Sequence, residues 1–105
     1  MTDVAAPAAA GVVLIKLNPN DNVAVAGGDI AIGATLAVGG QALSARQAIA
    51  AGHKIALAEI PAGAAVVKYG EVIGAATQAI RAGEHVHLHN LRSVRDSPEN
   101  KERLK

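Results

Sequence analysis

A short motif recurs four times in this chain and limits what the chain can fold into. Each copy has an isoleucine, a glycine three residues later and an apolar residue three residues after that. The copies span Ile30–Leu36, Ile49–Ile55, Ile60–Val66 and Ile80–Val86. Because glycine adopts positive φ at little cost, the motif is typical of an apolar anchor, a tight turn and the start of a strand. The copies are unevenly spaced, which argues against a solenoid and favours a mostly β domain with many glycine turns.

Composition limits the size of the core. Hydrophobic residues make up 50% of the 105 residues, but 24 residues are Ala, and the chain has one Tyr and neither Phe nor Trp. We therefore expect a thin, closely packed domain of Val, Ile, Leu and Ala that a partner chain supports. Exposed strand edges also make a homo-oligomer plausible for the isolated chain.

Several function classes are disfavoured by the same composition. A net charge of +1 and the lack of aromatic residues argue against a nucleic-acid partner. The chain has no Cys, which excludes disulfides and cysteine-bound zinc. No apolar run approaches the roughly 20 residues of a membrane span, so no membrane partner is expected. The start of the sequence is unlike a signal peptide, and we expect a cytoplasmic protein.

The local patterns predict the organisation of the chain. Residues 1–11 are expected to be a flexible Ala-rich lead-in, residues 12–91 the folded domain and residues 92–105 a charged flexible tail. Alternating or apolar runs predict strands at Val12–Leu17, Val23–Ala26, Ile55–Leu57 and Val86–Leu88. Gly39–Gly40 predicts a hairpin turn, and residues 18–22 predict a turn whose side chains bond their own backbone. Residues 44–51 have helical character, with Gly52 as the stop, so at most one short helix is expected.

The segment from His85 to His89 carries the strongest chemical signal. On an extended strand His85, His87 and His89 would share one face, with Val86 and Leu88 buried on the other. Such imidazoles can supply ligands to iron or zinc, or donors and proton carriers to an anionic substrate. A solvated polar strand face explains the same pattern, and the spacing alone does not decide between the two interpretations.

Two further segments carry candidate residues. His53 and Lys54 follow a glycine turn and offer a contact to a carboxylate, although such a basic pair can also simply be solvated. Tyr69, the single aromatic residue, is either the largest piece of the core or a hydroxyl aimed at a ligand.

With these motifs together, the chain resembles the small N-terminal domain of the altronate dehydratase family, which also includes galactarate dehydratase and the small subunit of sulfolactate sulfo-lyase. The resemblance rests on residues 21–24 (DNVA), 52–57 (GHKIAL), 68–74 (KYGEVIG) and 85–91 (HVHLHNL), in the order that the family has them. It implies a SAF-like β-clip fold, which agrees with the isoleucine–glycine repeats.

The resemblance also implies a function. Family members of this kind dehydrate sugar acids with a divalent metal, usually Fe(II) or Mn(II). A base removes the proton next to the carboxylate, and the metal stabilises the resulting enediolate. On this basis His53, Lys54 and Tyr69 are candidate catalytic residues, and His85 and His87 are candidate metal ligands. Asp21, Asn22 and Asn90 are candidate substrate contacts.

Fused family members continue into a large domain, whereas this chain stops at Lys105. We therefore expect a small subunit, inactive alone, that completes the active site of a separate large dehydratase subunit, which would hold most of the metal's ligands. One alternative is the small subunit of a sulfolactate sulfo-lyase. An alternative of another class is a non-catalytic β-clip module that binds a ligand or assembles a complex.

Overall fold

The computed structural model describes residues 13–38 and 40–93, and within them it contains β-strands and turns but no helix. The strands are β1 (Leu14–Ile15), β2 (Val23–Ala26), β3 (Thr35–Val38), β4 (Gln41–Ser44), β5 (Lys54–Ala56), β6 (Ala65–Lys68), β7 (Glu71–Ala76), β8 (His85–Val86) and β9 (Leu91–Ser93). The expected lead-in, residues 1–11, and nearly all of the expected tail lie outside the described residues.

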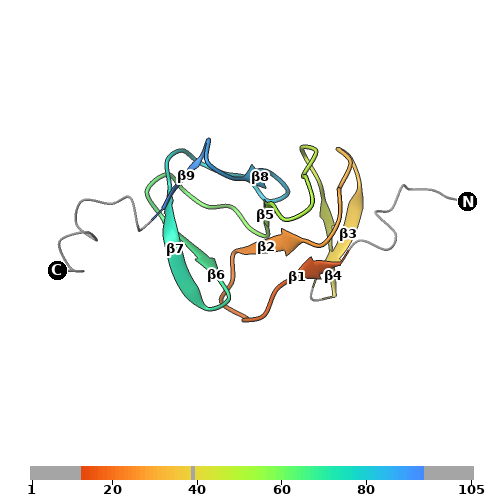
Figure 1. Cartoon of the computed structure of the whole chain (residues 1–105), viewed down its shortest axis with the longest axis horizontal. Helices are drawn as coiled ribbons and strands as arrows, with labels where there is room; N and C mark the ends of the chain where they lie inside the picture. The colour runs from red at the N-terminus through yellow and green to blue at the C-terminus, as the bar shows by residue number, and fades with distance from the viewer. Residues whose placement is uncertain (1–12, 39, 94–105) are drawn as a thin grey trace, which may run out of the picture.

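The strands form three small antiparallel sheets. A central sheet has the order β1-β2-β5-β8, and it lies between the β3–β4 hairpin and the β6-β7-β9 sheet (Figure 1). The predicted strand at Val23–Ala26 and the hairpin between β3 and β4 are therefore confirmed. The predicted mostly β fold is also confirmed.

The four repeat copies have the same structure. Their first residues are all buried, and each forms a two-way backbone bridge with another copy: Ile30 with Ile49, and Ile60 with Ile80. The glycines of the copies, Gly33, Gly52, Gly63 and Gly83, have φ between +83° and +90°. The last apolar residue of each copy is also buried. The motif thus marks an anchor, a left-handed turn and an entering strand, as predicted.

The core consists of two clusters, one for each pair of repeats. The first includes Ile30, Ile49 and Ile55, and the second includes Ile60, Ile80 and Val86. Neighbouring residues of the central strands alternate between the clusters, since Ile55 belongs to the first and Ala56 to the second. Burying each of these side chains stabilises the fold by about 1.5–3 kcal/mol. The thin core is thus divided over the two faces of the central sheet.

The predicted helix at residues 44–51 is wrong. Ser44 ends β4, and the backbone groups that a helix would use are bonded elsewhere. Ala45 donates its N–H to Ala34 (2.8 Å), and Ile49 exchanges hydrogen bonds with Ile30 at 2.9 and 2.8 Å. The tertiary bridges therefore override the local helical preference of this alanine-containing segment.

Two predicted strands are shorter than expected. Only Leu14–Ile15 is extended within the segment that begins at Val12, and Val12 lies outside the described residues. The strand that begins at His85 ends at Val86, so that Leu88 lies in a turn and is 83% exposed rather than buried. Leu88 therefore takes no part in the core.

The tip of the β6–β7 hairpin is held by the predicted turn at residues 18–22. Tyr69 and Gly70 both have positive φ, +56° and +80°, as a two-residue type I′ turn requires. The Asp21 carboxylate accepts a hydrogen bond from the N–H of Gly70 at 2.7 Å, and Asn18 accepts one from Asn20 at 2.9 Å. The predicted turn is therefore confirmed, and it also supports a neighbouring hairpin.

Asn22 joins β2 to β6. Its side-chain amide donates to the carbonyl of Ala65 at 2.9 Å and accepts from the N–H of Val67 at 2.7 Å. Asn22 therefore fastens the β6–β7 hairpin to the central sheet.

The repeat glycines provide a matched test of the turns. A Cβ on Gly83 would overlap the backbone oxygen of Ser44, whereas a Cβ on Gly63 would meet nothing within 4 Å. We predict that Gly63→Ala lowers the free energy of unfolding by about 1 kcal/mol, from the left-handed backbone alone. Gly83→Ala is expected to cost about 3 kcal/mol, because the overlap adds to this strain. Urea denaturation of both variants measures the difference, and equal losses would contradict it.

The Asp21 carboxylate gives a prediction on pH. Partial burial acts to raise its pKa, but hydrogen bonds from the N–H groups of Gly70, Tyr69, Asn18 and Leu17 outweigh this effect and lower the pKa from 3.8. A lowered pKa contributes stability above the ordinary value, and that contribution is lost as the pH falls through the folded value. Asp21→Asn should therefore unfold at a lower temperature than the wild type at neutral pH, and the gap should narrow below about pH 3.8.

Thermal melts at several pH values test this prediction. Asp29→Asn is the control, because the Asp29 carboxylate is exposed and accepts one backbone hydrogen bond, from Ala51 at 2.9 Å. A gap between Asp21→Asn and the wild type that stays constant with pH would contradict the role given to the charge.

Candidate functional site

Three histidines gather where β5 and β8 lie side by side. The antiparallel register pairs Ile55 with His85 and Lys54 with Val86, which brings His53 next to His87, one position further on. The turn of the second repeat places His53 directly before β5. The site therefore forms because the turns of the second and fourth repeats lead into β5 and β8, which are neighbours in the same sheet.

The three rings are close and nearly parallel. The ring centroids of His53 and His87 are 3.9 Å apart at an interplanar angle of 12°, and those of His53 and His85 are 5.0 Å apart. The Nδ1 of His53 lies 2.8 Å from the Nε2 of His85. One nitrogen from each ring can be chosen so that all three lie within 4.8 Å of one another. We call His53, His85 and His87 the histidine cluster.

The surroundings favour the neutral form of His85 and His87. Burial lowers the pKa of His85, and His89, His53, His87 and Lys54 lower it further by charge repulsion. Burial also lowers the pKa of His87, together with repulsion from neighbouring charged groups. The bond between His53 and His85 needs one ring to accept, so at least one of the two is neutral. Neutral imidazole is the form that binds metals.

One nitrogen of the cluster has no partner. The Nδ1 of His87 is buried and makes no hydrogen bond. Buried polar atoms are nearly always paired, so this imidazole nitrogen is a donor atom that a ligand could use.

The membership of the cluster differs from the expectation for an extended strand. His89 is not one of the three close rings, and its own ring is tilted by 37° against that of His85, 5.1 Å away. His53 takes the third place instead. The reason is that β8 ends at Val86, so the alternation of side chains stops before His89.

The side chains of Gln47 and Asn90 form hydrogen bonds with the backbone of residues 85–87, which we call the histidine strand. Gln47 accepts a hydrogen bond from the N–H of His85 at 2.8 Å. Asn90, which is 3% exposed, donates to the carbonyl of His85 at 2.8 Å and accepts from the N–H of His87 at 3.0 Å. Gln47 could not be recognised from its sequence context, because it lies in the segment predicted as a helix.

Lys54 lies beside the cluster and is half-buried. Burial lowers the pKa of its ammonium group, and the nearby Lys68 lowers it further. No carboxylate of the described residues is among the groups that shift this pKa. An unneutralised lysine of this kind is suited to bind an anion, and its amine is easier to deprotonate than that of a free lysine.

Tyr69 is not part of the core. It lies at the hairpin tip and is 39% exposed, and the Nζ of Lys68 is 5.2 Å from its ring centroid. The core interpretation is therefore wrong, and the catalytic role of Tyr69 stays a prediction.

The three predicted substrate contacts use their side chains inside the fold. Asp21 and Asn22 bond the β6–β7 hairpin rather than the histidine cluster, and Asn90 bonds the histidine strand. Their role as substrate contacts stays a prediction, as do the roles given to His53, Lys54, His85 and His87.

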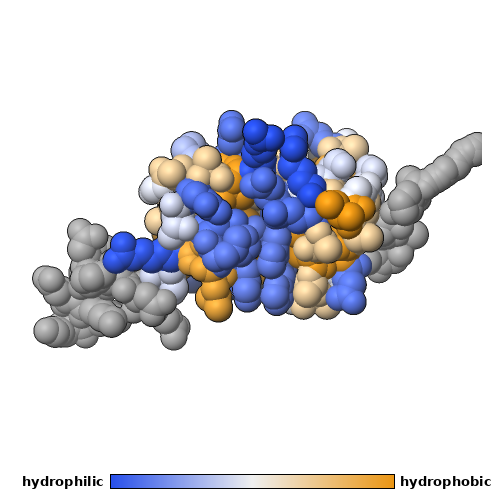
Figure 2. Space-filling model, turned by 90° about the horizontal axis from the view of Figure 1, so that it is seen from above, coloured by the Kyte–Doolittle hydropathy of each residue, from blue (hydrophilic) through white to orange (hydrophobic). Residues whose placement is uncertain are grey.

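The surface around the site is polar. Figure 2 shows a band of hydrophilic residues across the middle of the molecule, with more apolar areas on both sides.

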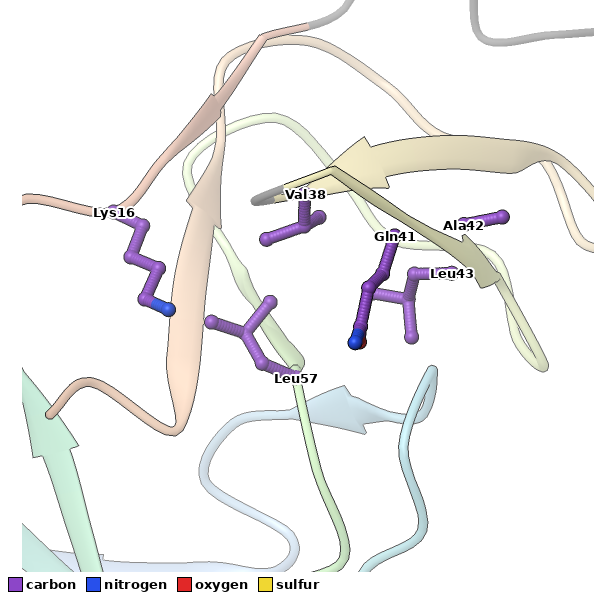
Figure 3. Close-up of a pocket in the computed structure, with 6 residues that line it drawn as sticks. All are labelled: Lys16, Val38, Gln41, Ala42, Leu43 and Leu57. Atoms are coloured by element: carbon purple, nitrogen blue, oxygen red, sulfur yellow. The ribbon is translucent and has the colours of Figure 1, made fainter. Parts of the chain in front are cut away.

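A small pocket of about 170 Å³ lies away from the histidine cluster, and it is lined by Lys16, Val38, Gln41, Ala42, Leu43 and Leu57 (Figure 3). It contains none of the predicted site residues. Among the described residues no helix is long and apolar enough to cross a membrane.

Comparison with known proteins gives a consistent result. Residues 12–94 match the family model of the altronate/galactarate dehydratase SAF domain. The altronate dehydratase of Escherichia coli is 51% identical over 79 residues, which are 75% of this chain and 16% of the relative. The galactarate dehydratase (L-threo-forming) of the same organism is 39% identical over 69% of this chain and 14% of the relative.

A shorter relative is similar at nearly the same level. The (2R)-sulfolactate sulfo-lyase subunit alpha of Chromohalobacter salexigens is 44% identical over 50 residues, which are 48% of this chain and 53% of the relative. The chain is thus similar to parts of hydro-lyases and to a sulfo-lyase subunit, and it spans less than a fifth of the length of the two dehydratases. The match over residues 12–94, together with the β fold built from glycine turns, shows that this chain belongs to the altronate/galactarate dehydratase SAF-domain family.

Proposed function

We propose that this chain is the small subunit of a sugar-acid dehydratase of the altronate type, and that its histidine cluster is a metal site of that enzyme. The observation that carries the proposal is the meeting of His53, His85 and His87 in a chain of this family. The resemblance of the chain to altronate dehydratase supports the substrate class.

The donor set fits a divalent metal of borderline softness. Three imidazole nitrogens are within reach of one another, and the Nδ1 of His87 lacks a partner. Imidazole suits Fe(II), and a site with three protein ligands leaves positions open for substrate. We propose Fe(II) or Mn(II), with further ligands from the partner subunit. When bound, the metal would act as a Lewis acid on the oxygens of the substrate.

The chain's own residues supply binding and proton transfer. Lys54 is placed to hold the carboxylate of a sugar acid, because its ammonium is half-buried beside the cluster and unneutralised. In the alternative mode, in which the metal would hold the carboxylate, the neutral amine of Lys54 would be the candidate base for the neighbouring proton, and the lowered pKa of Lys54 favours that neutral form. The family resemblance suggests a catalytic role for His53, but its position in the cluster favours a role as the third metal ligand. Lys68 lies close enough to Lys54 to affect its pKa, and the Tyr69 ring lies next to Lys68 at the tip of the β6–β7 hairpin.

The second candidate function is the small subunit of a sulfolactate sulfo-lyase. Two sulfo-lyase alpha subunits, 44% and 43% identical to this chain over about half of it, favour this alternative. The chemistry is closely related: the proton next to the carboxylate is removed, and sulfite leaves instead of water. A non-catalytic β-clip module is the alternative from another class, and it requires that Lys54 and the histidines have no effect on turnover.

A large partner subunit is part of the proposal. The dehydratase relatives are much longer than this chain, and the sulfo-lyase relatives are named as subunits. Leu88 supports the same conclusion, because it is 83% exposed on a tight turn directly beside the histidine cluster. A partner that covers the site would bury this side chain. The cytoplasm remains the predicted location.

The metal proposal predicts that the purified chain binds Co(II), a spectroscopic substitute for Fe(II). Alanine at His53, His85 or His87 should each weaken binding about 100-fold, because each removes a ligand. His89→Ala is the matched control and should bind within about threefold of the wild type. Calorimetry and the visible spectrum of Co(II) measure the effect. Equal affinity in all four variants would exclude a metal site at the cluster.

The partner proposal predicts that the tagged chain captures from its native cells a protein homologous to the remaining part of altronate dehydratase. Leu88→Asp should reduce capture about tenfold or more, since it places a charge in the interface. Ile32→Asp is the control, because Ile32 is similarly exposed, at 69%, in another turn.

Turnover by the captured pair identifies the reaction. Altronate, galactarate and sulfolactate are supplied in turn, and formation of a keto-deoxy acid is measured alongside release of sulfite. Sulfite release without dehydration would replace the dehydratase with the sulfo-lyase. Full turnover by Lys54→Ala and His87→Ala would favour the non-catalytic module.

A further inference from the structure

The strand that carries the histidines is very short and lies at an edge. β8 contains only His85 and Val86, and among the described residues it has a neighbouring strand, β5, on one side alone. The backbone groups of His85 that do not face β5 therefore pair with no strand within residues 13–38 and 40–93. A two-residue edge strand is weakly held by its backbone alone, so its histidines need further support.

Two side-chain amides take the place of the missing strand. The N–H of His85 donates to Oε1 of Gln47 at 2.8 Å, and the carbonyl of His85 accepts from Nδ2 of Asn90 at 2.8 Å. Asn90 also accepts from the N–H of His87 at 3.0 Å, and its own N–H donates to the carbonyl of His87 at 3.1 Å. Asn90 thus closes residues 87–90 into a tight turn and links the backbone of His85 to that of His87.

We propose that Asn90 and Gln47 are positioning residues of the histidine cluster, and that Asn90 sets the stacking of His87 on His53. Asn90 is 3% exposed, and three of its hydrogen bonds end on the backbone of His85 and His87. The side chain is therefore occupied by the histidine strand. The substrate contact expected for Asn90 from the family resemblance stays a separate prediction.

The expected loss of metal affinity rests on the proposed function, whereas the expected movement of the His87 ring in the metal-free chain does not. Without Asn90 the backbone of His87 loses the bond that fixes its direction, so the ring should leave the stacked position 3.9 Å from His53. The metal ligands would then no longer be held together before the metal binds.

Asn22 provides a matched control. Its side-chain amide also donates to one backbone carbonyl, at 2.9 Å, and accepts from one backbone N–H, at 2.7 Å. Those partners, Ala65 and Val67, belong to β6 rather than to the histidine strand. Asn22→Ala therefore removes an equivalent pair of bonds from the fold and leaves the support of the cluster in place.

The first measurement uses the metal-free chain. Nuclear magnetic resonance of the histidine rings should show the His87 ring signals of Asn90→Ala shifted toward those of an unstacked, exposed histidine. Asn22→Ala should leave them at their wild-type positions. The proposal is overturned if Asn90→Ala leaves the His87 signals in place, or if Asn22→Ala moves them equally.

Two further variants keep the test decisive if Asn90→Ala fails to fold. Asn90→Asp retains the acceptor for the N–H of His87 and should restore most of the stacked signal. Gln47 is exposed, so Gln47→Ala should fold, and it should shift the His85 signals, whereas Gln78→Ala, also exposed, should not. Unchanged His85 signals in Gln47→Ala would count against the proposal.

The second measurement is Co(II) affinity. Asn90→Ala should bind Co(II) about 10-fold or more weakly than the wild type and Asn22→Ala. Equal affinities of the two Asn variants would overturn the positioning role. Absence of Co(II) binding by the wild type would refute the metal site, while the ring signals would still decide the role of Asn90.

Discussion

The fold depends on backbone bridges between isoleucines that are far apart in the sequence. Ile30 exchanges two hydrogen bonds with Ile49, and Ile60 does so with Ile80, at 2.8–2.9 Å. Each bridge brings two glycine turns together and buries two large side chains in a chain that has few of them. Because buried backbone groups must be paired, the bridges also fix the direction of the strands that follow. The histidine cluster is a product of this geometry, since β5 and β8 both begin directly after such turns.

The cluster combines closeness with low charge. Three imidazoles stacked within a few ångströms would repel one another if all were protonated, and burial adds to this penalty. The fold resolves the conflict by lowering the pKa of His85 and His87 rather than by placing a carboxylate among the three rings. Neutral imidazoles beside a charged lysine agree with the proposed function, in which the cluster holds a metal and Lys54 holds the carboxylate of the substrate.

Much of the fold could be predicted from local chemistry. The glycine positions identified the four turns because positive φ is a property of a single residue, and the isoleucines identified the anchors. The helix at residues 44–51 was predicted wrongly because its backbone partners, such as Ile30, are distant in the sequence. The prediction that Leu88 is buried was wrong because β8 ends at Val86 and the chain then enters a turn, which local alternation does not reveal.

The candidate site was predictable in its residue types and less so in its arrangement. His85 and His87 were identified by their alternation, and His53 by its place after a glycine. That His53 rather than His89 completes the cluster follows from the antiparallel register of β5 and β8. Register depends on contacts across the whole domain, and a single sequence does not show them.

The strand β5 contributes to the cores of both halves of the molecule, where each half is one pair of repeats with its core cluster. β5 begins within the second repeat and precedes the third, and its adjacent residues Ile55 and Ala56 belong to different core clusters. Neither half can be separated from the other without losing a wall of its own core. The two halves should therefore unfold as a single cooperative unit, and the histidine cluster depends on both of them, because His53 lies in the second repeat and His85 in the fourth.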